Sequence, residues 1–205
     1  MKAALISIQA KWCNLIASGK KTVEARKTKP KIDVPFKCYI YCTKKEKEVF
    51  FTEEVFDSQR GKYAIPHVGN GKIVGEFVCN RIDDFYCCSV PYREKNNLGY
   101  GAFIDNGVYK VKGWHEGVVF ERNDRYIDSM LKNNDLKEMC LSVQEIFDYI
   151  GVGKHLYGWH ISNLVIYDKP KELGEFEGLR KTKFGYEPIK ITRPPQSWCY
   201  VEELT

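Results

Sequence analysis

Three charged residues that follow a glycine near the start of the chain could bind a ligand or act on one. Lys21, Glu24 and Arg26 lie in the run from Gly19 to Arg26. A carboxylate can act as a general base or accept a hydrogen bond from the amino group of a nucleobase, and a lysine can contact a phosphate or a carbonyl. The same residues can also form an ion pair that only stabilises the local structure, because structural ion pairs cluster in the same way.

A helix and a strand on either side of Gly19 are expected to position these residues. Residues 10–18 carry apolar side chains at helical spacing, and Gly19 lies where a helix ends in a residue that tolerates positive φ. Alternate residues of a strand point to the same side, so Thr22, Glu24 and Arg26 are expected to share one face. The sequence therefore predicts a charged group at a tight corner between a helix and a strand.

The composition is that of a globular domain. The chain has 205 residues, of which 43% are hydrophobic and 14% aromatic, enough for one domain with a sizeable core. No apolar run approaches the length of a membrane span and the first residues do not have the pattern of a signal peptide, so we expect a cytoplasmic protein with no membrane partner. Eight cysteines are then expected to be thiols. Their spacings do not form a zinc site, and we expect no metal and no cofactor.

Positive charge is concentrated in two stretches. Residues 20–31 carry six basic residues and one acidic residue, a local charge of +5 that equals the net charge of the chain. Residues 180–193 carry five basic residues and one acidic residue. The two stretches can line one surface that follows a phosphate backbone, or they can be two solvated loops. The candidate phosphate contacts are Lys27, Lys29, Lys31, Lys181 and Lys183.

Aromatic residues offer a second kind of contact to a nucleobase. Trp12, Trp159 and Trp198 are candidate stacking surfaces, since every base presents a flat face. Aromatic side chains are more often part of a core, and both alternatives stay open here. His160 is predicted to be a hydrogen-bonded residue of a strand rather than a catalyst.

The pattern of apolar residues predicts an α+β fold, a small mixed β-barrel with flanking helices and a central insertion. Strands are expected at residues 3–8, 36–43, 72–79, 157–167 and 194–201, and a second helix at 142–150. That helix begins with the capping box of Ser142 and Glu145. Gly75, inside a strand, indicates a bulge or a close backbone approach. Residues 86–140 have a looser pattern and are interpreted as an insertion or lid within a single domain, 1–205.

The run after Gly19 resembles the signature of a known family. Gly19-x-Lys21-x-x-Glu24-x-Arg26 resembles the G-x-K-x-x-E-x-R motif of the ASCH domain family, whose fold is similar to the PUA barrel of RNA-modifying proteins. Further matches are the runs 71–76, 157–161 and 194–200. The last two resemble the longer ASCH proteins of gut bacteria and their phages. The resemblance covers residues 1–85 and 141–203.

This resemblance implies a cleft beside the first helix, with Lys21, Glu24 and Arg26 around it, that binds RNA or a modified nucleoside. Small ASCH proteins include enzymes. In an amidohydrolase subfamily that acts on N4-acetylcytidine, a threonine is the nucleophile at the position of Glu24, and this departure argues against the same chemistry here. The alternative to a binding protein is a small hydrolase, a nucleoside amidohydrolase or a ribonuclease. Lys21 and Glu24 would then be the acid–base pair, and Thr22 a further catalytic candidate.

Overall fold

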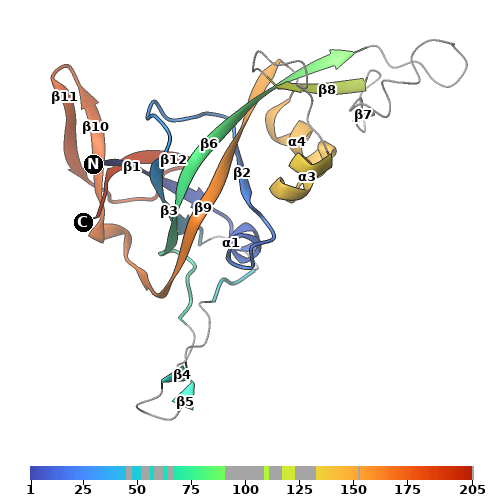
Figure 1. Cartoon of the computed structure of the whole chain (residues 1–205). Coiled ribbons are helices and arrows are strands. Elements are labelled where there is room, and N and C mark those ends of the chain that lie inside the picture. The colour runs from blue at the N-terminus through green and yellow to red at the C-terminus, as the bar shows by residue number, and fades with distance from the viewer. Residues whose placement is uncertain are drawn as a thin grey trace, which may run out of the picture. The chain divides into compact units, whose positions relative to one another are not determined.

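A computed structural model of the chain describes residues 1–44, 48–51, 56–57, 62–63, 67–90, 109–110, 117–122, 133–151 and 153–204 (Figure 1). These residues form a mixed α+β fold, which confirms the fold class predicted from the sequence. Most strands belong to one large sheet. A second sheet joins only β4 (Phe56–Asp57) and β5 (Lys62–Tyr63).

Strand β1 (Lys2–Ile8) has neighbours on both edges in the large sheet. It pairs parallel with β3 (Phe36–Cys42) and antiparallel with β12 (Trp198–Glu202). Six of its seven residues are buried, which explains why its sequence is apolar without alternation. Parallel neighbours need a crossover connection, and the segment between β1 and β3 contains helix α1 (Ala10–Ala17).

The strand order of the large sheet is β11-β10-β12-β1-β3-β6-β8-β7, and β9 pairs with both β2 and β6. Within the described residues the sheet is not closed. The remaining bounds are β2 (Val23–Arg26), β6 (Ile73–Val90), β7 (Tyr109–Lys110), β8 (Gly117–Arg122), β9 (Lys154–Lys171), β10 (Glu177–Thr182) and β11 (Gly185–Lys190).

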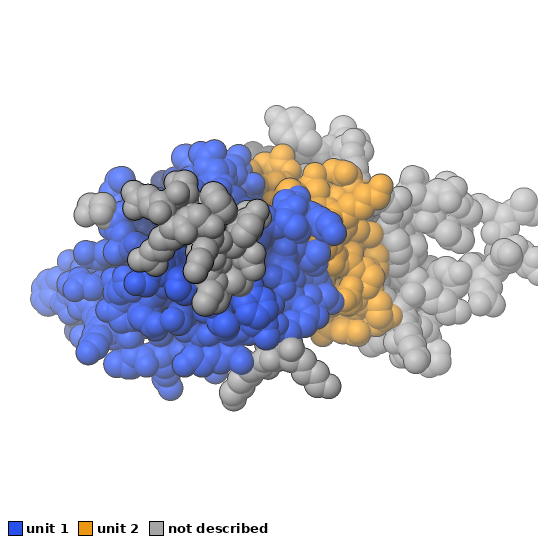
Figure 2. All heavy atoms as spheres, turned by 90° about the horizontal axis from the view of Figure 1, so that it is seen from below, with its two compact units in different colours: residues 1–20, 30–80, 161–205 blue, residues 21–29, 81–160 orange. Residues whose placement is uncertain are grey.

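The chain divides into two compact units, which are described one at a time (Figure 2). Unit 1 consists of residues 1–20, 30–80 and 161–205, and unit 2 of residues 21–29 and 81–160. Each unit is therefore made of segments that are distant in the sequence. The organisation predicted from the sequence, one domain with an insertion at 86–140, stays a prediction, since much of that segment lies outside the described residues.

The core of unit 1 lies between β1, β3 and the strands around them. Its members are Ala3, Leu5, Tyr39, Tyr41, Ile73, Phe176 and Val201. The sequence prediction for Gly75 is confirmed, because a Cβ there would collide with the carbonyl oxygen of Val165 and lie 3.2 Å from the Cα of Ile166. The register of β3 on β6 also shifts between Ile40 and Tyr41. Gly75 thus lies at a bulge where two backbones approach closely.

The core of unit 2 lies between one side of its strands and two helices. These are α3 (Asn133–Met139) and α4 (Val143–Ile150), seen beside β2 in Figure 1. The core residues are Val23, Ala25, Phe85, Cys87, Met139, Val143, Ile146, Ile150 and Leu156. Removing a side chain of this kind from water stabilises a fold by about 1.5–3 kcal/mol. The two helices therefore cover the apolar side of these strands.

Helix α4 begins and ends as the sequence predicts. The backbone N–H of Glu145 donates to Oγ of Ser142 at 3.2 Å, and the N–H of Ser142 donates to the Glu145 carboxylate at 2.8 Å. Gly151 follows the helix with φ 76°, a conformation that favours glycine. Both α1 and α4 have eight residues, and among the described residues no helix is long and apolar enough to cross a membrane.

Seven cysteines of the described residues are thiols, and five of them are buried. They are Cys13, Cys38, Cys42, Cys79, Cys87, Cys140 and Cys199. Burial raises the pKa of Cys199 to about 11, so this thiol is protonated at neutral pH. A protonated thiol is a poor nucleophile.

Candidate nucleic-acid interface

The charged residues of the Gly19 motif form one buried group of ion pairs in unit 2. Nη2 of Arg26 lies 3.0 Å from Oε1 of Glu24, and Nζ of Lys21 lies 3.4 Å from Oε2. Nζ of Lys21 also donates to the carbonyl oxygen of Met139 at 2.5 Å. The side chains of Lys21 and Glu24 are only 2% and 7% exposed. The structure therefore brings the three predicted residues together, and it places them in the interior.

The local structure around these residues follows from the corner that precedes them. Gly19 has φ 70°, as expected for the end of a helix. Thr22 comes before the first residue of β2, its side chain is exposed, and its backbone N–H donates to the carbonyl oxygen of Glu138 at 3.0 Å. The hydroxyl of Thr22 is thus presented to solvent, while Lys21 and Glu24 are not.

One side of the unit 2 strands carries polar and aromatic residues. In the pairing of β2 with β9, Glu24 lies opposite Trp159 and Arg26 lies opposite Tyr157. Residues opposite each other in antiparallel strands point to the same side. Because side chains alternate along a strand, His155 shares this side with Tyr157. We call it the polar face of unit 2.

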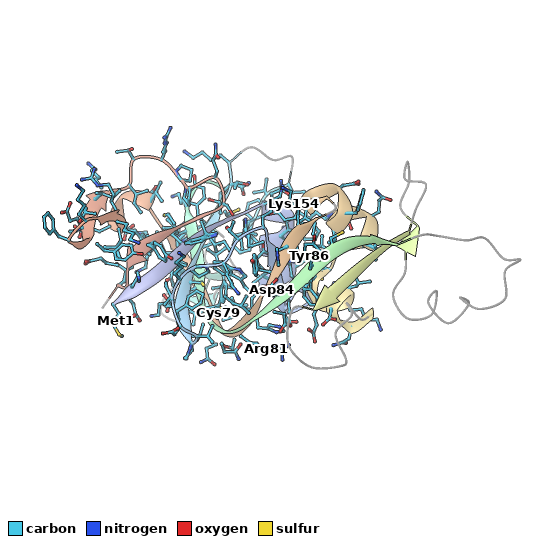
Figure 3. The ribbon with its side chains drawn as sticks, turned by 90° about the horizontal axis from the view of Figure 1, so that it is seen from above. Met1, Cys79, Arg81, Asp84, Tyr86 and Lys154 are labelled. Atoms are coloured by element: carbon cyan, nitrogen blue, oxygen red, sulfur yellow. The ribbon has the colours of Figure 1, made fainter. Side chains whose placement is uncertain are left out.

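The rings of Tyr86, His155 and Tyr157 lie next to one another on this face, and we call them the unit 2 aromatic row. The rings of His155 and Tyr157 are stacked, with centroids 5.8 Å apart and planes 9° apart, and the centroid of Tyr86 lies 5.2 Å from that of His155. Asp84 Oδ1 lies 2.7 Å from Nδ1 of His155. This carboxylate fixes the orientation of the imidazole. Figure 3 labels Asp84 and Tyr86, which are alternate residues of β6.

A lysine ammonium group lies over the same row. Nζ of Lys29 is 5.0 Å from the centroid of Tyr157 and 3.6 Å from Oδ2 of Asp84. The side chain of Lys29 is 49% exposed, so its charge is available to a ligand. Lys27 is also exposed, and its Nζ lies 4.6 Å from the centroid of Tyr149 in α4. Each lysine thus combines a positive charge with an aromatic ring.

The phenols of Tyr157 and Tyr149 are neutral at physiological pH. Burial, with a smaller contribution from the negative charge of Asp84, raises the pKa of Tyr157 above its ordinary value. Burial also raises the pKa of Tyr149, although the positive charge of Arg26 opposes this change. Tyr157 and Tyr149 can therefore stack and form hydrogen bonds, but they are not bases at neutral pH.

A second histidine–aspartate pair lies on β9 and β6. Nε2 of His160 is 2.8 Å from Oδ2 of Asp83, and Nη2 of Arg81 is 3.1 Å from the same oxygen. Asp83 is buried, and the side chain of His160 is 17% exposed. His160 is a hydrogen-bonded residue of a strand, as the sequence predicts.

The other predicted contacts are divided between the two units. Trp159 belongs to unit 2 and is fully buried, with no exposed surface. Trp12 and Trp198 belong to unit 1 and are partly buried. The five predicted phosphate contacts are all exposed, Lys27 and Lys29 in unit 2 and Lys31, Lys181 and Lys183 in unit 1. Their roles as ligand contacts stay predictions.

Sequence reasoning did not find the unit 2 aromatic row. Two spacings could have indicated it. His155 lies two residues before Tyr157, the first residue of a predicted strand, and Asp84 and Tyr86 are two residues apart just after another. Residues at this spacing share one side of a strand, so the pairing of β6 with β9 brings both sets together.

Comparison with known proteins gives matches only among solved structures. No family model matches the chain, and no curated protein matches it. The chain is similar to ASCH from Zymomonas mobilis, with 16% identity and a TM-score of 0.45 over 98% of this chain and 88% of that one. Two mutants of the same protein give TM-scores of 0.43 and 0.44 at 16% identity, and cover 99% and 98% of this chain and 92% and 89% of theirs. The similar structures are ASCH domains. This is the family that the motifs resemble.

Proposed function

We propose that this chain binds RNA or a modified nucleoside on the exposed part of the polar face of unit 2. A base stacks on the unit 2 aromatic row, and Lys29 and Lys27 contact phosphate groups. The observation that carries the proposal is the position of Lys29, whose ammonium group lies over Tyr157 beside the stacked ring of His155. Stacking surfaces flanked by cations are how proteins bind single strands.

The two kinds of contact supply different parts of the binding energy. Stacking of a base on an aromatic side chain contributes about 1–3 kcal/mol and depends little on sequence. Phosphate contacts release counterions, so their contribution falls as salt increases. Asp84 neutralises part of the charge of Lys29 and holds His155 in place. A ligand phosphate would compete with Asp84 for the ammonium group.

The buried ion pairs of Lys21, Glu24 and Arg26 stabilise the strand next to the polar face. Arg26 lies opposite Tyr157 in the strand pairing, and Glu24 holds both Arg26 and Lys21. Since β2 ends at Arg26, these contacts also set where the chain carries Lys27 and Lys29. We assign Lys21, Glu24 and Arg26 as positioning residues of the binding face.

Fluorescence anisotropy with a labelled single-stranded RNA tests the proposal. We expect Tyr157→Ala to weaken binding roughly 5- to 100-fold, the loss of one stacked base. Tyr157→Phe is the matched control, because it keeps the ring, and it should bind as the wild type does. Lys29→Ala should weaken binding of all sequences alike and reduce the slope of log K against log salt by about 1.

Two results would contradict the proposal. One is a wild-type affinity that does not change with salt, because phosphate contacts always make binding salt-dependent. The other is a Tyr157→Ala variant that binds as tightly as Tyr157→Phe.

A hydrolase that uses Lys21 and Glu24 as an acid–base pair is the second candidate. The observation in its favour is the 3.4 Å contact between Nζ and Oε2 of these residues, although both are buried. Incubation with N4-acetylcytidine and with single-stranded RNA, followed by analysis of the products, separates the two functions. Turnover that Glu24→Gln abolishes in a folded protein would support the hydrolase, and intact substrates in both reactions would support binding alone.

A further inference from the structure

The β10–β11 hairpin of unit 1 exposes an aromatic side chain among basic ones. Phe184, in the turn between the two strands, is 97% exposed. Lys183 precedes it in the turn, Lys181 lies near the end of β10, and all the residues of β11 are exposed. In Figure 1 this hairpin extends from one end of the strand order. A phenylalanine in this position adds nothing to the core.

One exposed aromatic residue on its own needs no explanation, but the hairpin continues into a group of further rings. The centroid of Tyr186 on β11 lies 5.4 Å from that of Tyr200, and Tyr200 lies 5.1 Å from Trp198, with both pairs at 77°. We call Tyr186, Tyr200 and Trp198 the unit 1 aromatic row. All three rings are partly exposed.

Positive charge accompanies this row. Nζ of Lys2 lies 4.1 Å from the centroid of Tyr186 and 4.9 Å from that of Tyr200. Lys181 lies opposite Tyr186 in the hairpin register, so both point to the same side. The one acidic residue of the stretch 180–193, Glu187, lies 3.6 Å from Arg180. This pair is exposed and contributes little to stability. It does not involve Lys181 or Lys183.

We propose that the β10–β11 hairpin is a second binding site, for single-stranded nucleic acid, in which Phe184 stacks on a base. Lys181 and Lys183 contact the phosphates on either side of that base, and the strand continues over the unit 1 aromatic row. This inference rests on the proposed function for the class of ligand, and it assigns a separate site in the other unit. A duplex does not fit, because its bases are already stacked and paired.

The charge of the hairpin favours a nucleic acid over other partners. Membrane-binding segments place a broad apolar surface in the lipid, whereas the turn here has a single phenylalanine next to lysines. A protein partner would require a larger continuous apolar patch. An exposed ring between lysines, followed by partly exposed rings that Lys2 lies over, matches a chain of bases and phosphates.

Anisotropy of the full chain with labelled single-stranded RNA tests the inference through Phe184. Since Phe184 is almost fully exposed, its replacement leaves the fold intact. We expect Phe184→Ala and Phe184→Leu each to weaken binding roughly 5- to 100-fold, and Phe184→Tyr to bind as the wild type. Leucine keeps the apolar character and loses the flat ring, so this variant separates stacking from general apolar contact.

Three other outcomes would overturn the inference, and they can be told apart. Wild-type binding that Phe184→Ala leaves unchanged removes the second site and leaves the proposed function standing. No binding of RNA by the wild type removes both. Binding to vesicles of anionic lipid that needs Phe184 and is kept by Phe184→Leu would assign the hairpin to a membrane instead.

Discussion

Glu24 has a cation at each of its two carboxylate oxygens, and all three side chains are buried. Removing one partner from a buried ion pair leaves an uncompensated charge in a medium of low dielectric. An exposed ion pair contributes much less, because water and salt screen it. Comparing the same substitution at a buried and at an exposed glutamate therefore measures how much burial adds to the contribution of an ion pair to stability.

We expect Glu24→Gln to lower the free energy of unfolding by about 3–5 kcal/mol. Glu187→Gln is the matched control, because Glu187 forms an exposed pair with Arg180, and it should change this free energy by about 1 kcal/mol or less. Denaturation with urea, followed by circular dichroism, measures both. If Glu24→Gln were as stable as the control and yet lost RNA binding, Glu24 would be a ligand contact and not a positioning residue.

Residue spacing predicts part of this group. Alternation along a strand places Glu24 and Arg26 on one side, which the sequence shows directly. Their burial could not be predicted in the same way. The carbonyl oxygen that accepts from Lys21 belongs to Met139, 118 residues further along the chain, and no local pattern indicates that contact.

At the scale of elements, the backbones of β6 and β9 approach each other closely at Gly75. We expect Gly75→Ala to destabilise the protein by about 1–3 kcal/mol, because the new methyl group collides with the backbone at Val165 and Ile166. Gly174, in the short helix η1 (Leu173–Glu175), is the control, since a Cβ there meets nothing within 4 Å. Gly174→Ala should be neutral or stabilising by up to about 1 kcal/mol. Thermal unfolding of the two variants compares them, and equal melting temperatures would contradict the expectation.

The sequence predicts the elements that have a clear capping motif or a continuous apolar run. The capping box of α4 and the apolar runs of β1 and β3 are present where expected. Strands β6 and β9 extend well beyond their apolar runs to 18 residues each. Residues 85–90 of β6 pair with β8, and Asp83 and Asp84 contact histidines of β9. The β10–β11 hairpin and α3 were not predicted, since their charged sequences lack a clear apolar period.

At the scale of the whole molecule, each unit carries its own aromatic row and its own exposed lysines. The two sets of contacts share no residue, so their contributions to binding are expected to add. We expect the double variant Tyr157→Ala with Phe184→Ala to weaken binding of a long single-stranded RNA by the product of the two single effects. Anisotropy of the four proteins in parallel gives the comparison. A double variant no weaker than either single variant would mean that only one of the two proposed sites takes part in binding.

Synthesis from the N-terminus leaves one edge of β1 unpaired for much of translation. Unit 2 ends at His160, so all of it is synthesised before the strand that pairs antiparallel with β1. Until residues 198–202 emerge, a nascent chain holds β1 against β3 with its other edge open. An open edge of an apolar strand attracts other strands. Chaperones that protect such edges would therefore act on this protein from the emergence of β3 until residues 198–202 are free to pair with β1.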